Sequence, residues 1–457
     1  MNLTSQFQNT IHRTLIIFAL IGTLASCNNQ KTTSTDSDTA SAPVVKTDTT
    51  KKVQDFSLTM PVLNALFIEE AFKMQLKSEL QLTDEQIKQL ETAAGEAVAE
   101  LSEDGTNYLG SARAARKQSE DEIRRILGPE KAEQLASLVA YRYAGGDIEG
   151  LFPTTPNAVP ADTRVVINAP AFRMDVFQEG KLVKTYKIGI GYPEFPLPTG
   201  MRKAESIIFN PTWTPPDEPW VKGKVQAGRK VAAGSELNPL GLIKIPIGLP
   251  SLIHGGKTTD KLGNFASHGC VGLTNEQVQD FSSVLAQLAG SSITSADIEN
   301  YESKPKTTKT VTLTKPVPVE LRYETIVAEN GNIHIYQDVY ERGTNTVADA
   351  VRILKTYGVE YSALSSAEKA SLSAALTEMN FDSQGNPIAE SISSTDTTIA
   401  NSGTTAKSKD GVAASKQQGA KTGKVTRNVT GVKELSIPIA ALKGKGYPAA
   451  VMLNEGL

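Results

Sequence analysis

The distribution of proline limits the fold of this chain more than any other feature. Fourteen of the 23 prolines lie between Pro153 and Pro250. Proline has no backbone N–H and clashes inside a helix, so long helices are excluded from this stretch. Short apolar or alternating segments occur there instead, at 164–168, 172–177, 182–188 and 206–209. The turn residues 178–181 separate the second segment from the third, which predicts a β-hairpin, and we expect a mainly β domain here.

Composition excludes several classes of protein. The 457 residues include 47 Lys and Arg against 50 Asp and Glu, a net charge of −3, which excludes a strongly basic nucleic-acid-binding protein. Two cysteines exclude a disulfide scaffold and a zinc module built from several cysteines. Hydrophobic residues make up 39% of the chain, so part of it lies outside any core.

Residues 57–148 are expected to form a small helical domain of three or four helices. Apolar residues recur there at three- and four-residue steps, as on one face of a helix: Ile87, Leu90, Ala94, Val98 and Leu101. Two capping-box patterns, Thr83 with Gln86 and Ser119 with Glu122, predict helix starts, and Gly128-Pro129 predicts a break. We interpret this domain as a scaffold or docking bundle, separable from any chemistry in the β domain.

Residues 1–27 have the pattern of an export signal. The first 30 residues lack Asp and Glu, and His12-Arg13 precede about ten apolar residues, fewer than the ~20 that span a bilayer. The following Leu24-Ala25-Ser26-Cys27 resembles a lipobox, the cleavage site of bacterial lipoproteins. The resemblance implies lipidation of Cys27 and anchoring to a lipid bilayer; the alternative is a plain signal peptide with a coincidental cysteine. Asn28 favours the outer membrane if the cell has two.

The segments on either side of the two expected domains are polar. Half of residues 31–50 are Ser or Thr, which predicts a flexible tether over 28–56. Residues 346–382 are expected to form a helical extension, with a cap at Ser365 or Ser366. No aromatic residue occurs from 382 to 446, so 383–457 is expected to be a low-complexity, disordered tail with a strand or docking segment near its end. Nine Lys and Arg against two Asp and Glu in 407–445 fit a solvated tail or a contact with anionic wall polymer or lipid headgroups.

The candidate chemistry lies in the β domain, where His254, His268 and Cys270 fall within 17 positions. If Cys27 is lipidated, Cys270 is the one free thiol of an exported protein and a candidate nucleophile. A nucleophilic thiol needs a base or cation beside it, and His254 can reach it from an adjacent strand or a returning loop. Gly269 allows backbone N–H groups to approach a reacting carbonyl oxygen.

This stretch resembles the catalytic domain of the L,D-transpeptidase (YkuD-type) family. The signature is a His, a spacer and then Ser/Thr-His-Gly-Cys, here His254 followed by Ser267-His268-Gly269-Cys270. Further similar segments flank it in the family's order: Pro198-Thr199-Gly200, Asn210-Pro211-Thr212-Trp213-Thr214-Pro215-Pro216, Asn238-Pro239-Leu240-Gly241, Arg322-Tyr323-Glu324-Thr325 and Asp338-Val339-Tyr340. The resemblance covers about two-fifths of the chain and implies a catalytic domain over 155–345 with a β-sandwich or barrel.

The resemblance also implies cysteine acyl transfer on peptidoglycan stem peptides. Cys270 would form a thioester and release D-alanine, with His254 as general base and the Gly255 carbonyl orienting it. Backbone N–H groups of His268, Gly269 and Cys270 would hold the oxyanion, in a site also lined by Ser267. The acceptor would be an amine of a second stem peptide or of another envelope protein, and water as acceptor would give an L,D-carboxypeptidase. No metal or organic cofactor is expected.

One position departs from the family pattern, and it leaves alternatives open. Family members commonly carry Arg, sometimes Asn, two residues after the cysteine, where this chain has Gly272. Arg202, Lys257 or Lys261 could supply a replacement charge. A catalytically inactive, peptidoglycan-binding lipoprotein is therefore the competing interpretation, and a metal site at His254, His268 and Cys270 is a weaker one. Substrate-binding roles are further expected for three positions: Asn210, Trp213 and Gly272. Trp213 and Trp220 either line a cleft or close the end of a barrel.

Overall fold

The computed structural model describes residues 56, 58–99, 101, 109–143, 153, 155–215, 225–226, 228–249, 251–291, 293–388 and 428–451. The chain divides into two compact units, Met1–Val53 and Gln54–Leu457, and every described residue belongs to the second. The expected signal peptide with Cys27, nearly all of the tether, Trp220 and most of the tail lie outside the described residues. Within the part that is described, no helix is both long enough and apolar enough to cross a bilayer.

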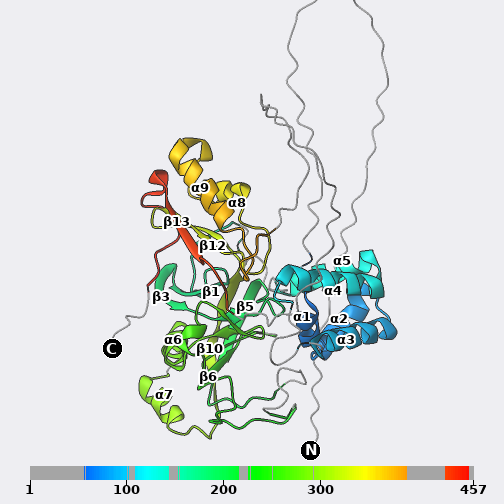
Figure 1. Ribbon diagram of the computed structural model, residues 1–457. Coiled ribbons are helices and arrows are strands. Elements are labelled where there is room, and N and C mark those ends of the chain that lie inside the picture. The colour runs from blue at the N-terminus through cyan, green and yellow to red at the C-terminus, as the bar shows by residue number, and fades with distance from the viewer. Residues whose placement is uncertain are drawn as a thin grey trace, which may run out of the picture. The chain divides into compact units, whose positions relative to one another are not determined.

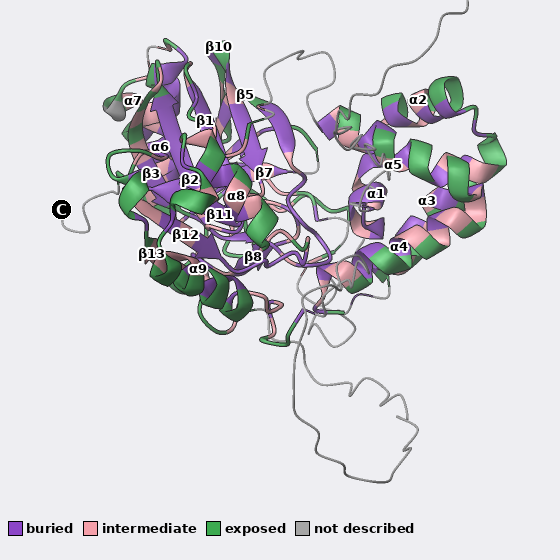
Figure 2. Ribbon diagram, turned by 90° about the horizontal axis from the view of Figure 1, so that it is seen from above, coloured by how far each residue is buried: buried purple, intermediate pink, exposed green. Residues whose placement is uncertain are grey.

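The N-terminal part of this unit is helical (Figure 1). It contains five helices within its described residues, rather than three or four: α1 (Met60–Leu66), α2 (Glu70–Leu80), α3 (Asp84–Ala99), α4 (Ala112–Leu127) and α5 (Pro129–Tyr143). The apolar stripe predicted on α3 is buried, and α3 and α4 carry exposed and buried residues on different sides (Figure 2). Phe56, the last residue of the expected tether, is already buried in this helical core.

Two of the predicted helix boundaries have different outcomes. Thr83 and Gln86 cap the start of α3 reciprocally, each accepting a hydrogen bond from the other's backbone N–H. The prediction that Ser119 caps a helix is wrong, because α4 begins earlier with Ser111 as its N-cap. The Ser119 hydroxyl lies inside α4, donates to the Ala115 carbonyl and accepts from the backbone N–H of Met60. Ser119 thus fastens α1 to α4.

An eight-stranded sheet forms the centre of the second part, in the order β3-β2-β1-β10-β5-β6-β7-β9. Its strands are β1 (Arg164–Asn168), β2 (Arg173–Gln178), β3 (Lys181–Lys187), β5 (Gly200–Phe209), β6 (Ile243–Pro246), β7 (Leu252–His254), β9 (Val271–Gly272) and β10 (Lys309–Arg322). Neighbouring strands are antiparallel except β1 with β10 and β7 with β9. A parallel pair, β4 (Ile190–Gly191) with β8 (Phe265–Ser267), lies beside it.

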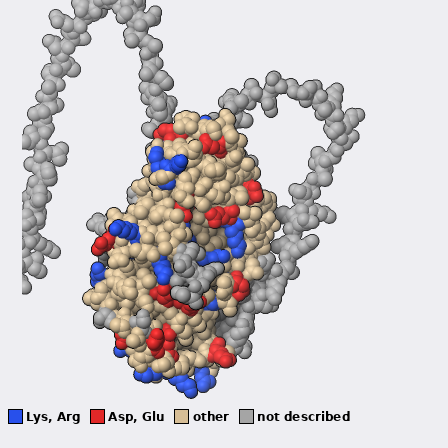
Figure 3. Space-filling model, turned by 90° about the vertical axis from the view of Figure 1, so that its left-hand side faces the viewer, with Lys and Arg blue, Asp and Glu red and all other residues tan. Residues whose placement is uncertain are grey.

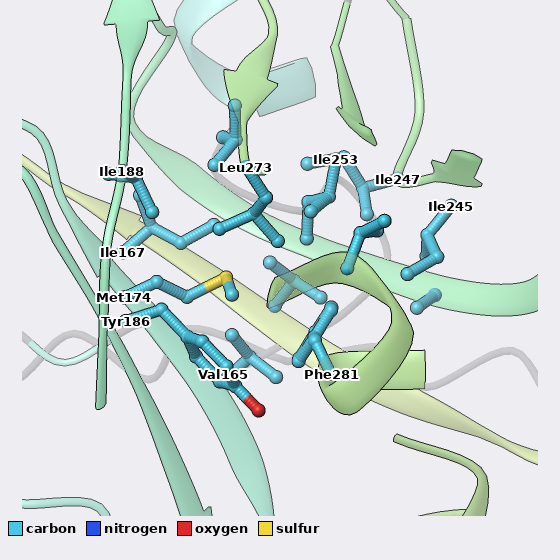
Figure 4. Close-up of a cluster of buried hydrophobic side chains, with 14 of the residues drawn as sticks. Val165, Ile167, Met174, Tyr186, Ile188, Ile245, Ile247, Ile253, Leu273 and Phe281 are labelled. Atoms are coloured by element: carbon cyan, nitrogen blue, oxygen red, sulfur yellow. The ribbon is translucent and has the colours of Figure 1, made fainter. Parts of the chain in front are cut away.

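The core of this domain lies between the curled sheet and one helix. The helix α6 (Asn275–Leu288) presents Phe281 to apolar side chains of the strands, as Figure 4 shows for Val165, Tyr186 and Ile245. A short helix, α7 (Ser295–Glu302), follows α6. A mainly β domain preceded by a helical bundle, α+β overall, is confirmed.

A smaller sheet joins segments far apart in the sequence. It consists of β11 (Ile326–Glu329), β12 (Asn332–Tyr336) and β13 (Glu434–Pro438), and α8 (Val347–Thr356) and α9 (Ser366–Glu378) cover it. The predicted helical extension is therefore two helices, and Ser365 caps the second with a capping box. The strand expected near the end of the tail is present, because β13 pairs along β12, and Ile439 and Leu442 after it are buried in one core with α9. The expected disorder therefore does not extend over 428–451.

The helical part contacts the β domain through buried polar groups. Glu341 accepts hydrogen bonds from the backbone N–H of Ala112 and the hydroxyl of Ser111, both at the start of α4. Arg116 donates to the carbonyls of Tyr340 and Glu341. On the surface, positive and negative side chains are interspersed on the face shown in Figure 3, in keeping with the small net charge.

Candidate active site

Strand pairing at the edge of the sheet brings His254 and Cys270 together. In the parallel pair β7 and β9, Ile253 lies opposite Val271 and His254 opposite Gly272. Side chains alternate between the two faces of a sheet, and both Ile253 and Val271 are fully buried in the core. His254 and Gly272 therefore share the other face, and Cys270 lies at the end of the turn directly before β9. The separation of sixteen residues corresponds to adjacent strands.

His254 is fixed as a neutral imidazole. Its side chain is 3% exposed, and Nδ1 lies 2.7 Å from the carbonyl oxygen of Gly255. A carbonyl can only accept, so Nδ1 carries the proton and the lone pair of Nε2 is free to accept one. Burial lowers the pKa of His254 to about 3, and the nearby Lys257 ammonium adds to the shift against the opposing carbonyls of Gly255 and Leu240.

The glycine after His254 is required by close packing against α6. A Cβ atom on Gly255 would lie 2.7 Å from Asn275 Oδ1 and 2.8 Å from Cγ1 of Val278. Asn275 Oδ1 accepts hydrogen bonds from the N–H groups of Gly256 and Leu242, at 2.9 and 3.2 Å. Asn275 thereby holds the loop whose carbonyl orients His254. The sequence analysis missed this residue, although the capping box of Thr274 with Gln277 marks the start of its helix.

A tight turn presents the cysteine. The hydroxyl of Ser267 donates to the Cys270 carbonyl at 2.5 Å and accepts from the Cys270 N–H at 2.9 Å. Gly269 has a φ of +92°, which L side chains rarely adopt. The expected oxyanion donors need correction, since the Cys270 N–H is occupied by Ser267. The N–H of Gly269 has no hydrogen-bond partner within the described part of the chain.

The Cys270 thiol and the His254 ring are both uncharged in the free protein at neutral pH. Burial raises the pKa of the Cys270 thiol, and the Leu252 N–H and the Lys257 ammonium only partly oppose this shift. Since the pKa of His254 is lowered, the pair is a thiol beside a neutral imidazole rather than a preformed thiolate–imidazolium pair. Proton transfer to His254 must then accompany attack by the sulfur.

The His268 ring packs against two aromatic rings, and His254 remains the candidate base for Cys270. The His268 ring meets Tyr192 edge-on at 5.1 Å between centroids and Phe195 at 4.8 Å. These contacts position the turn that holds Gly269. No group of three or more His, Cys, Asp or Glu side chains suited to a metal occurs among the residues the structure describes.

Two residues expected to bind substrate have other contacts. Asn210 is 2% exposed, and its amide donates to the backbone carbonyls of Tyr301, Lys304 and Thr307. The expectation that Asn210 binds substrate is therefore corrected, because its buried amide joins the end of β5 to the end of α7 and to the segment after it. Trp213 is half-buried and its backbone pairs with Val231, so its indole stays a candidate for the substrate cleft.

The third of these positions, Gly272, lies opposite His254, beneath the side chain of Lys257. A glycine there offers no side chain to substrate.

Residues 162–316 match the family model of the L,D-transpeptidase catalytic domain (YkuD). This stretch of the chain is therefore similar to the L,D-transpeptidase catalytic domain. The matched segment carries β1 to β9 and most of β10, including the turn of Cys270 and the strand of His254.

Known proteins similar to this chain carry the same family name. The curated relatives include the "Probable L,D-transpeptidase YbiS" of Escherichia coli strain K12 and of strain CFT073, each 34% identical over 121 residues. The match covers 25% of this chain and 39% of each relative, so the chain spans about two fifths of their length.

Similar solved structures include the catalytic domain of an E. faecium L,D-transpeptidase, 15% identical, with a TM-score of 0.24 over 36% of this chain and all of that one. An L,D-transpeptidase from Mycobacterium smegmatis is also 15% identical, with a TM-score of 0.22 over 35% of this chain and 59% of that one. At these scores the structural similarity carries no argument about function.

Proposed function

We propose that this protein is an L,D-transpeptidase that acts on peptidoglycan stem peptides by cysteine acyl transfer. The observation that carries the proposal is the pairing of the strand that ends at His254 with the strand that directly follows Cys270, inside a domain that matches the family. The Nδ1–H of His254 is held by the Gly255 carbonyl, which leaves Nε2 to take a proton. A protein that only binds peptidoglycan has no chemical use for this arrangement.

Acylation follows from these positions. The thiol proton of Cys270 passes to Nε2 of His254 as the sulfur attacks the carbonyl carbon of the donor amide. The N–H of Gly269 donates to the oxygen that becomes negative. When the C–N bond breaks, His254 returns the proton to the leaving amine, which departs as D-alanine, and the acyl group stays on sulfur as a thioester.

Deacylation reverses the proton path. An acceptor amine, from a second stem peptide or from an envelope protein, gives its proton to His254 and attacks the thioester. A new amide forms and Cys270 regains its proton. Water in place of the amine would give a carboxypeptidase, so the acceptor decides which product the same site makes.

We also propose that the protein is exported and anchored to the membrane by lipid on Cys27, in the outer membrane if the cell has two. The support is the sequence of residues 1–28 alone. Mass spectrometry of the protein from membranes tests this: an N-terminal peptide that begins at an acylated Cys27 is expected. A chain that begins elsewhere, or an unmodified Cys27, would overturn it.

The proposed reaction is tested by intact-protein mass spectrometry of the full chain in detergent, mixed with a disaccharide-tetrapeptide donor. The expected product is an adduct equal to the donor minus D-alanine, absent from Cys270→Ala and strongly reduced in His254→Asn. Added acceptor amine should discharge the adduct into a cross-linked product, whereas discharge by water alone identifies the carboxypeptidase. A folded protein that binds the donor but never forms the adduct would instead be the binding lipoprotein.

A further inference from the structure

The side chain of Lys257 lies across Gly272, directly beside the candidate nucleophile. A Cβ atom built on Gly272 would lie 2.8 Å from Cγ of Lys257, 3.0 Å from its Cε and 3.4 Å from its Cδ. Gly272 does not have a positive φ, so its backbone would accept a side chain. The Lys257 N–H donates to the Leu273 carbonyl at 3.0 Å, which fixes the root of this side chain at the end of β9. The stem of Lys257 thus occupies the space in which a side chain at position 272 would lie.

The ammonium group of Lys257 has no counter-charge. Within the described residues, neither a hydrogen bond nor an ion pair reaches it, although its side chain is half-buried. Burial lowers its pKa, and the groups that act on it besides are the Cys270 thiol and the Lys261 ammonium. Lys244, on the strand beside His254, adds a further positive charge that burial also disfavours. No carboxylate is among the groups that shift the pKa of His254, Lys257 or Cys270.

Activation of the thiol does not account for this charge. The ammonium lowers the pKa of Cys270 and also lowers the pKa of His254. Transfer of a proton from sulfur to imidazole creates a negative and a positive charge beside the same ammonium, so the two effects oppose each other. A substrate anion, in contrast, would be attracted by the Lys257 ammonium, and no second charge that the ammonium repels would form with it.

We infer that Lys257 binds a carboxylate of the acyl-donor peptide, seated over Gly272 beside Cys270. The inference rests on the proposed function for the identity of the donor and adds the residue that selects it. The carboxylate belongs either to the residue that leaves or to the residue that is transferred to sulfur, and both have the same chemistry. Lys257 thereby acts on donor binding and orientation rather than on the bond-breaking step.

The test compares variants of the full chain in detergent with matched donors. Lys257→Met keeps the packed stem over Gly272 and removes the charge, whereas Lys257→Arg keeps a cation. Gly272→Ala keeps the lysine but displaces its stem through the Cβ contact at 2.8 Å. The donors are the tetrapeptide, the same peptide amidated at its terminal carboxylate, and the same peptide amidated at the carboxylate of the transferred residue. Adduct formation by mass spectrometry, as a function of donor concentration, separates half-saturation from the maximal rate.

Lys257→Met and Gly272→Ala are expected to raise the half-saturating concentration of the free-acid donor about tenfold or more, the range of one charge-assisted contact, with a similar maximal rate. Lys257→Arg should stay within a few-fold of the native chain. The amidated donor that is insensitive to Lys257→Met identifies the carboxylate. Equal losses for all three donors, or a lower maximal rate with unchanged half-saturation, would overturn the inference.

A binding measurement separates this inference from the proposed function. Calorimetry of the tetrapeptide with Cys270→Ala, with and without Lys257→Met, reports carboxylate binding with no turnover. Binding that depends on Lys257, together with a native chain that forms no adduct, would refute the transpeptidase and keep the carboxylate site. Adduct formation by the native chain, together with binding that is unchanged by Lys257→Met, would support the transpeptidase and refute the carboxylate site.

Discussion

The reactivity of Cys270 should rise steeply with pH, because the structure holds Cys270 and His254 in their neutral forms. The pKa of His254 falls from 6.5 to about 3, a shift of about 3.5 units, or about 5 kcal/mol against the imidazolium. Burial raises the pKa of Cys270 above its ordinary value, so the thiol form predominates at pH 7. We therefore expect no preformed ion pair of the kind that makes some cysteines reactive in acid.

Alkylation by iodoacetamide measures this directly. The rate for the native chain should climb roughly tenfold per pH unit between pH 6 and pH 9, with no plateau below pH 9, because the thiolate is the reacting form. Cys270→Ala reports any label taken at other positions, and this background is subtracted. In His254→Asn the slope should persist, since His254 carries no charge over this range. A rate that is flat from pH 5 to pH 8 would show a thiolate–imidazolium pair and refute the reasoning.

Three further outcomes follow from named contacts. The pKa of His254 is lower in the folded state, so the neutral ring stabilises the fold above pH 6.5, and this stabilisation is lost as the pH falls toward 3. From pH 7 to pH 4, the free energy of unfolding measured in urea should therefore fall by a few kcal/mol more in the native chain than in His254→Asn. Equal decreases would contradict the burial argument. Asn275→Ala leaves the N–H groups of Gly256 and Leu242 without their acceptor. It should lower the free energy of unfolding by about 1–3 kcal/mol and slow acylation. Asn275→Asp keeps the accepting oxygen and should unfold close to the native midpoint. Glu341→Ala removes both oxygens that accept hydrogen bonds from the start of α4, so it should lower the thermal unfolding midpoint more than Glu341→Gln does. An unchanged midpoint in both variants would argue against a stabilising role for these contacts.

Local patterns in the sequence predicted the hairpin that begins the β domain. Residues 164–168 form β1 as expected, and the turn of Glu179 and Gly180 joins β2 to β3 with φ values of 49° and 78°. Such a turn is encoded in four residues, since only residues that tolerate positive φ fit it. The helical periodicity of α3 is local in the same way. Both features depend on contacts between residues near in sequence.

Long-range contacts limited the prediction elsewhere. Ser119 has the pattern of a helix cap, but its hydroxyl bonds the backbone of Met60, 59 residues away, inside a longer helix. The sequence indicated a strand or docking segment at 434–442, inside a tail with a composition typical of disorder, but it did not indicate that β12 is the partner strand. Lys257 was one of three candidate cations in the sequence. Only the structure places its stem on Gly272, because the sequence does not indicate which side chain packs over a glycine.

The contacts of the helical bundle argue that it is part of the catalytic unit rather than a separable scaffold. The Thr59 hydroxyl donates to the Glu194 carbonyl, and the Gly110 N–H donates to the Glu194 carboxylate, which is 2% exposed. The next residue, Phe195, packs against Leu101 on its bundle side and against the ring of His268 at 4.8 Å. Loss of the bundle would expose a buried carboxylate and free the aromatic residue that positions the His268-Gly269 turn. We therefore expect the position of Cys270 to depend on Thr59, Leu101 and Gly110, so that the smallest part of the chain that keeps the site intact extends beyond the matched domain.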